Sequence, residues 1–185
     1  MHIVFRMKKD IEKIIEFEEG IGVIQNGDEI VIKGKIGENK RKFNFRDIEV
    51  KIESHSISLK KDKANKNDKK QLNAIAAHIK NMIAGVSKKY EYVLEICSVH
   101  FPMTLKIEKD KLNIKNFLGE RKERTVKILP EVNVEIKGSN VIITSIDKEK
   151  AGRQATLIEG ISRVVGKDKR VFQDGIWIVK KEKGK

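Results

Sequence analysis

The sequence contains very little cysteine, few aromatic residues and no long hydrophobic run. Cys97 is the only cysteine among 185 residues, which excludes an internal disulfide and any zinc site built from several cysteines. No apolar run approaches the roughly 20 residues that a membrane-spanning helix needs, and residues 1–6 lack the pattern of a signal peptide. We therefore expect a cytoplasmic protein with no membrane partner, no metal and no cofactor.

Aromatic residues are scarce, with seven Phe, two Tyr and one Trp. A protein that binds single-stranded nucleic acid uses exposed rings on which bases stack. Here most rings fall within apolar strand patterns, as around Phe43, Phe45 and Trp177, and we interpret them as core residues. If the partner is a nucleic acid, we expect contacts mainly to phosphate and sugar of a structured duplex.

Positive charge is what the sequence has in excess. Lys and Arg number 40 against 27 Asp and Glu, which gives a formal net charge of +13. Residues 1–85 carry 18 bases and 13 acids, whereas residues 86–185 carry 22 bases and 14 acids. This excess predicts a polyanionic partner, although solubility alone is an alternative explanation. With 39% hydrophobic and 36% charged residues, the chain is expected to fold.

An internal repeat is the most informative local signal. Residues 29–40 align with residues 111–122 without a gap, at an offset of 82. The identical positions in the first copy are Ile32, Lys33, Gly37, Glu38 and Lys40. The same offset brings Val23 onto Leu105 and a helical stretch ending at Ile83 onto Val165. We predict a tandem duplication with two similar domains, residues 1–85 and 86–185, the second ending in the basic residues 180–185.

Each repeat contains short alternating segments followed by one amphipathic helix. The predicted strands of the first repeat are residues 23–25, 30–32, 43–45, 50–52 and 57–59. Those of the second are residues 90–99, 105–107, 112–114, 126–128, 132–136 and 141–144, with a last hairpin of 170–173 and 176–179. The polar residues 60–70 predict a loop that leads into a helix over 72–86, and Asp147 is a predicted N-cap for a helix from Lys148 to about Val165. This order predicts an α+β fold in which a mostly antiparallel sheet carries one packed helix, twice.

We find no catalytic or metal-binding motif. Cys97 and His100 have a C-x-x-H spacing but supply only two ligands, so Cys97 is interpreted as a buried strand residue. Gly20, Gly22, Gly34 and Gly37 lack the strand–loop–helix context of a phosphate-binding loop and are interpreted as turn residues. The adjacent carboxylates Glu18 and Glu19 would not face one reaction centre, and the histidines are scattered, at His2, His55, His78 and His100. We predict that the protein is not an enzyme.

Six strings, in order over essentially the whole chain, are residues 15–20, 78–86, 100–104, 116–120, 146–149 and 170–176. Together they carry a resemblance to the universal large-subunit ribosomal protein six family, in its archaeal and eukaryotic branch. It implies two tandem α+β domains and a structural role in the large subunit of cytoplasmic ribosomes. It also implies binding to ribosomal RNA close to the sarcin–ricin loop, with neighbouring ribosomal proteins as partners and translational GTPases docking nearby. The second domain is implied to make most of the RNA contact.

The candidate RNA-binding residues accordingly lie in the second repeat. The helix that begins after Asp147 offers backbone N–H groups to a phosphate, with Lys148 beside them. Arg153 and Arg163 are ten residues apart, which places them about 80° apart around a helix. The full set is Arg121, Lys122, Arg124, Lys148, Arg153, Arg163, Lys167, Lys169, Arg170, Lys180, Lys181 and His100. Two alternatives remain open: a basic adaptor that recruits an acidic protein partner, and an RNA-processing enzyme.

Overall fold

The chain divides into two compact units, and the boundary between them in the sequence lies between Lys88 and Lys89. The computed structural model describes residues 9–18, 20–45 and 48–181. The predictions made for His2, for Glu19 and for the last four residues of the basic C-terminal end fall outside the described residues.

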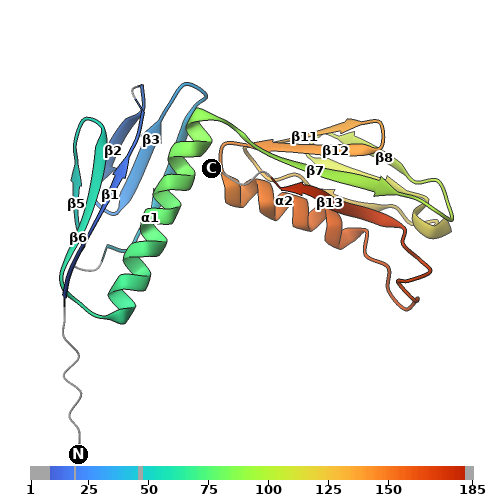
Figure 1. Cartoon of the computed structure of the whole chain (residues 1–185). Coiled ribbons are helices and arrows are strands. Elements are labelled where there is room, and N and C mark those ends of the chain that lie inside the picture. Colours follow the sequence, from blue (N-terminus) through green and yellow to red (C-terminus); the bar gives the residue numbers. More distant parts are fainter. Residues whose placement is uncertain (1–8, 19, 46–47, 182–185) are drawn as a thin grey trace, which may run out of the picture. The chain divides into compact units, whose positions relative to one another are not determined.

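The first unit consists of two small sheets and one long helix (Figure 1). Its elements are β1 (Lys9–Glu16), β2 (Gly22–Asn26), β3 (Glu29–Lys33), β4 (Glu38–Lys42), β5 (Glu49–Ile52), β6 (Ser56–Ala64) and α1 (Lys66–Ser87). The strands pair antiparallel in the orders β1-β6-β5 and β2-β3-β4. Asn65 caps α1 by accepting the N–H groups of Asn67 and Asp68, and the Asp68 carboxylate accepts the N–H of Asn65.

The core of the first unit lies between α1 and the strands. Ile79 of α1 and Ile32 of β3 are completely buried, as are Ile57 and Leu59 of β6. The recurrence of apolar residues every three or four positions along α1 produces this buried stripe. The predicted first helix and the hairpin of β2 and β3 are confirmed.

The second unit has a larger sheet with its helix along one face (Figure 1). Its elements are β7 (Tyr90–Cys97), β8 (Thr104–Glu108), β9 (Lys111–Lys115), the 3-10 helix η1 (Phe117–Gly119), β10 (Arg124–Lys127), β11 (Val132–Lys137), β12 (Asn140–Ser145), α2 (Lys148–Ile161) and β13 (Gly175–Lys181). The strands pair antiparallel in the orders β10-β9-β8 and β11-β12-β7-β13. Ala151, Ala155 and Ile158 of α2 are fully buried, as is Leu94 of β7, so α2 packs on the sheet through its apolar side.

The two units have the same topology. The order β1-β6-β5 corresponds to β7-β12-β11, and β2-β3-β4 corresponds to β8-β9-β10. The strands β2 and β3 and the helix α1 begin 82 residues before β8, β9 and α2. The second unit adds β13 at the side of β7 that β12 leaves open. The predicted α+β class is confirmed, whereas the origin of the two units by duplication stays a prediction.

Two predictions about the first unit are wrong. Residues 43–45 are not a strand, because β3 begins at Glu29 and offers no partner beyond Lys42. The strand that pairs with β3 is β4, which precedes residues 43–45. Its five residues are all polar or charged and therefore show no apolar pattern. The predicted loop at residues 60–70 is also wrong, since β6 continues to Ala64 and pairs with β1 as far as Lys9.

Two predictions about the second unit are wrong as well. The helix α2 ends at Ile161 instead of Val165. The Arg124 guanidinium donates to the carbonyl oxygen of Ile161, and the Ser162 hydroxyl accepts the N–H of Ile176 at 2.9 Å, so these groups replace the next helical turn. Residues 170–173 form no strand, since β13 pairs with β7 and not with the segment before it. Arg163 consequently lies beyond α2, and the angle that relates it to Arg153 on a helix does not apply.

Candidate nucleic-acid interface

The predicted basic residues lie at two separate ends of the second unit. Tyr92, near the start of β7, is opposite Lys181, while Cys97 at its end is opposite Gly175. An eight-residue strand is about 25 Å long, so these ends are well apart. We call one the helix-start end, with Lys148, Arg153, Lys180 and Lys181. We call the other the loop end, formed by residues 98–103, 116–123 and 162–174, where Figure 1 shows the loop after α2 and the loops of the yellow and green segments.

The helix-start end combines its basic residues with carboxylates. Asp147 caps α2 and accepts the N–H of Glu149 at 2.8 Å. Lys180 Nζ lies 3.8 Å from a carboxylate oxygen of Glu91, and Lys148 Nζ lies 5.7 Å from the ring centre of Tyr90. The N-terminus of α2 therefore already has negative charge beside it, which disfavours the phosphate predicted there.

The loop end is held together first by Asp174. Its side chain is only 1% exposed, and its carboxylate accepts the backbone N–H groups of Val99 at 2.8 Å and His100 at 3.0 Å. A further hydrogen bond of 2.6 Å joins it to Nδ1 of His100. Burial raises the pKa of Asp174, but the hydrogen bonds from His100 and Val99 outweigh burial and hold that pKa below its ordinary value. Asp174 thus ties residues 98–103 to the loop that follows α2.

His100 has a structural position in this arrangement. Its ring stacks on Phe172, with ring centres 4.7 Å apart and planes inclined by 23°. The hydrogen bond to Asp174 fixes one ring nitrogen. Although His100 is among the candidate RNA contacts, the structure shows that it fastens two loops to each other.

Arg124 bonds the third loop, residues 116–123, to the end of α2. Its guanidinium donates to Glu120 at 2.5 and 2.8 Å and to the carbonyl oxygens of Ile161 at 2.7 Å and Arg163 at 3.2 Å. It also lies over the buried ring of Phe117, 4.0 Å from the ring centre. The hydrogen bonds from Arg124 hold the pKa of Glu120 below its ordinary value. Arg124 therefore uses its donors within the chain, where it caps the end of α2.

The remaining basic residues of the loop end are exposed. They are Arg121, Lys122, Arg163, Lys167, Lys169 and Arg170. Arg170 forms an ion pair with Asp168 at 2.8 Å, and Lys167 Nζ lies 4.4 Å from the ring centre of Phe172. The other four have no ion-pair partner among the residues that the structure describes. The loop end is therefore a surface of largely uncompensated positive charge on loops that internal hydrogen bonds hold in place.

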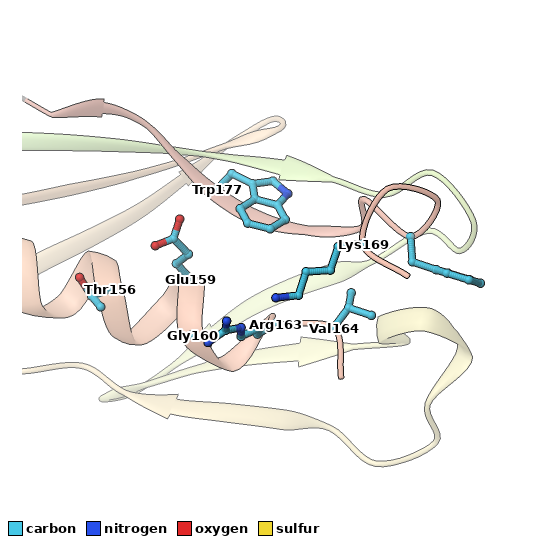
Figure 2. A pocket seen from close by; sticks show the side chains of 8 residues that line it. Thr156, Glu159, Gly160, Arg163, Val164, Lys169 and Trp177 are labelled. Carbon is cyan, nitrogen blue, oxygen red and sulfur yellow. The ribbon is translucent and has the colours of Figure 1, made fainter. Parts of the chain in front are cut away.

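Trp177 is a further feature of the loop end, and its interpretation as a core residue is wrong. Ile176 is 0% exposed, whereas Trp177 beside it is 44% exposed, because neighbouring residues of a strand point to opposite sides. Trp177 borders a cavity of about 400 Å³ (Figure 2). The cavity is lined by Thr156, Glu159, Gly160, Arg163, Val164, Lys169, Phe172 and Trp177. Residues 176–179 are all apolar, so the sequence contains no alternation that separates Trp177 from the core.

The described residues contain no group of three or more His, Cys, Asp or Glu side chains arranged to hold a metal ion. Within the same residues, neither helix is both long and apolar enough to cross a membrane. Cys97 closes β7 as predicted, but its side chain is half-buried.

These observations define a class of protein: a pair of α+β units of which one presents a basic loop surface. Residues 101–175 match the family model described as "Ribosomal protein L6". Proteins named "Large ribosomal subunit protein uL6" are similar over nearly the whole chain. The relative from Methanobrevibacter smithii is 41% identical over 93% of this chain and 97% of its own length. The relative from Methanocella arvoryzae is 42% identical over 92% of this chain and 98% of its own length. The relative from Aeropyrum pernix is 39% identical over 95% of this chain and 98% of its own length.

The chain belongs to the uL6 family of large-subunit ribosomal proteins. This membership confirms the resemblance predicted from the sequence strings. The family is a structural one, so membership also confirms the prediction that the protein is not an enzyme.

Proposed function

We propose that this protein is a structural constituent of the large ribosomal subunit of cytoplasmic ribosomes and binds ribosomal RNA mainly through its second unit. The observation that carries this proposal is the similarity to uL6 proteins over more than nine-tenths of the chain. Within the second unit, the loop end makes the main RNA contact. This contact lies near the sarcin–ricin loop, in the region where translational GTPases dock and other ribosomal proteins are neighbours.

The electrostatics of the second unit support the loop end as the main contact. Lys and Arg side chains that neutralise phosphates release condensed counterions, and this release favours binding. At the loop end, Arg121, Lys122, Arg163 and Lys169 are exposed and form no ion pair with a described residue. At the helix-start end, Asp147 and Glu91 reduce the attraction for a phosphate. Lys148, Arg153, Lys180 and Lys181 thus contribute a smaller share.

The rigidity of the loops supports the same proposal. Asp174 and Arg124 bond the three loops of the loop end to one another and to the end of α2. Side chains on fixed loops lose less conformational freedom when they bind than side chains on loose ones. A fixed pattern of basic side chains therefore selects a folded RNA by its shape.

Sedimentation tests the ribosomal assignment. We expect the native protein to sediment with large subunits in moderate salt and to be released in high salt, because phosphate contacts weaken as salt increases. Persistent absence from the large-subunit fraction would contradict the proposal. Recovery with an acidic protein complex in its place would support the adaptor alternative.

Directed RNA cleavage tests the location. Val165 is 82% exposed at the loop end, and Cys97 is the only cysteine. A Cys97→Ser, Val165→Cys variant carries a tethered hydroxyl-radical source at one known position. In reconstituted large subunits we expect cleavage of ribosomal RNA around the sarcin–ricin loop. Cleavage confined to distant RNA helices would show that the location is wrong, even if the protein is still bound to the subunit.

A further inference from the structure

The exposed indole of Trp177 is held in one orientation. Its Nε1 donates to the carbonyl oxygen of Gln173 at 3.1 Å. Gly175 lies under the ring, since a Cβ at this position would be 3.3 Å from the indole. The result is a fixed aromatic surface of the kind on which nucleic-acid bases stack. The other ring at the cavity, Phe172, is already covered by His100 and Lys167.

Two basic side chains enter the same cavity. Figure 2 shows the Lys169 side chain extending below Trp177 toward Arg163. Neither side chain forms an ion pair with a described residue, so both are available to an anionic group. A phosphate group placed between them suits both an ammonium and a guanidinium.

The cavity also contains a carboxylate. Glu159 comes from the last turns of α2 and is half-buried. Its Oε1 accepts the backbone N–H of Ile178 at a long 3.4 Å, and within the described chain no donor is bonded to Oε2. A ligand that suits this cavity must therefore bring hydrogen-bond donors for Glu159 as well as an anionic group for Arg163 and Lys169.

We propose that this cavity receives one unpaired guanine nucleotide that is extruded from the bound ribosomal RNA. The base stacks on Trp177, its Watson–Crick N–H groups donate to Glu159, and its phosphate lies between Arg163 and Lys169. Guanine fits because it presents two neighbouring N–H donors, whereas uracil presents one. A volume of about 400 Å³ is within the roughly 300–1,000 Å³ of ordinary ligand pockets. The proposal rests on the proposed RNA-binding function and names the subsite that reads a base.

The single tryptophan provides a direct test, because all indole fluorescence of this chain comes from Trp177. The full-length protein is titrated with a short RNA hairpin that has one bulged guanosine. Matched hairpins have a bulged uridine, an abasic bulge or no bulge. We expect the bulged guanosine to quench the fluorescence and to bind roughly 5- to 100-fold more tightly than the paired hairpin, as base–aromatic stacking predicts.

Three variants separate the parts of the subsite. Trp177→Leu should abolish the preference for the bulged hairpin, and Glu159→Gln should reduce the preference for guanosine over uridine. Val179→Ala changes an exposed residue of the same strand and should leave both preferences unchanged. Binding of Trp177→Leu is measured by competition with a labelled hairpin.

The outcomes also distinguish this proposal from the proposed function. If all hairpins quench equally, or if Trp177→Leu keeps the bulge preference, the guanine subsite is wrong, while salt-sensitive binding to large-subunit ribosomal RNA still supports the function. If the protein does not bind that RNA at all, the function is wrong, and the hairpin titration still decides whether the cavity binds guanine. If Trp177 responds only to other large-subunit proteins, the cavity is a protein-docking site and the guanine proposal is overturned.

Discussion

At the scale of single residues, Asp174 and His100 join two loops that lie 74 positions apart in the sequence. A buried carboxylate without partners is costly, and here three hydrogen bonds compensate for burial. The lowered pKa of Asp174 reflects this balance, since the bonds favour its charged form. The residue has no predicted role in the sequence analysis because its partners come from a distant segment.

Replacement of Asp174 by Asn tests this contact. We expect the free energy of unfolding at pH 7 to fall by about 1–3 kcal/mol, as for other buried hydrogen bonds to a charged group. A carboxyl group whose folded pKa is depressed stabilises the protein above its unfolded pKa of about 3.9. This stabilisation is lost as the pH falls through the folded pKa, so the difference between wild type and Asp174→Asn should shrink on acidification below about pH 4.

Denaturant unfolding at several pH values measures this effect. The isosteric change Asp110→Asn, at the exposed turn between β8 and β9, is the control and should change stability little. A difference between wild type and Asp174→Asn that is independent of pH would show that the carboxylate charge is not responsible.

Arg124 supports a second prediction at this scale. Arg124→Met keeps a long side chain over Phe117 but removes the bonds to Glu120 and to the last carbonyls of α2. We expect a loss of about 1–3 kcal/mol in the free energy of unfolding, since these are hydrogen bonds from a charged donor. Arg121→Met alters an exposed neighbour and should be nearly neutral. Equal effects of the two changes in denaturant unfolding would refute the capping role of Arg124.

At the scale of elements, the end of β3 lies unusually close to the end of α1. A Cβ at Gly34 would be 2.8 Å from Cβ of Val86 and 3.0 Å from its carbonyl oxygen. The Ile36 N–H donates to this same carbonyl at 3.4 Å. The chain can pass the helix here only because Gly34 has no side chain.

Gly34→Ala should therefore destabilise the first unit by about 1–3 kcal/mol, the usual cost of overpacking. Gly22→Ala is the matched control, because nothing lies within 4 Å of a Cβ at Gly22 and its backbone is not in the left-handed region. Thermal unfolding of both variants measures the difference. A Gly34→Ala variant as stable as Gly22→Ala would show that α1 shifts without cost.

At the scale of the whole molecule, the net charge of +13 is less informative than its distribution. At the helix-start end of the second unit, the carboxylates of Asp147 and Glu91 lie beside the basic residues, whereas most basic residues of the loop end form no ion pair with a described residue. We predict that removing three charges from the loop end affects RNA binding more than removing three from the helix-start end. The loop-end variant is Arg121→Gln, Lys122→Gln, Lys167→Gln, and the helix-start variant is Arg153→Gln, Lys180→Gln, Lys181→Gln.

Both variants change the net charge equally, so any difference is due to position. For the loop-end variant we expect the slope of log K against log salt to decrease in magnitude by about two to three, near one for each lost phosphate contact. The helix-start variant should change the slope less. Equal changes would indicate attraction by overall charge and would contradict a localised interface.

Local sequence patterns predicted the α+β class, most strands, the start of α2 and the family, whereas the first helix was predicted to begin at residue 72 and begins at Lys66. These features depend on local periodicity, on capping residues and on strings that adjacent residues carry, so no tertiary partner is needed to read them. The 82-residue offset likewise predicted the positions of β8, β9 and α2 from those of β2, β3 and α1.

The features that depend on a distant partner became visible only in the folded chain. The polar strand β4 exists because β3 lies beside it, and α2 ends where Arg124 and Ser162 bond its last turn and the strand that follows. The exposure of Trp177 and the separation of the basic residues into two ends depend on how β13 pairs with β7. Because hydrogen bonds and burial join residues far apart in the chain, a local pattern does not contain them.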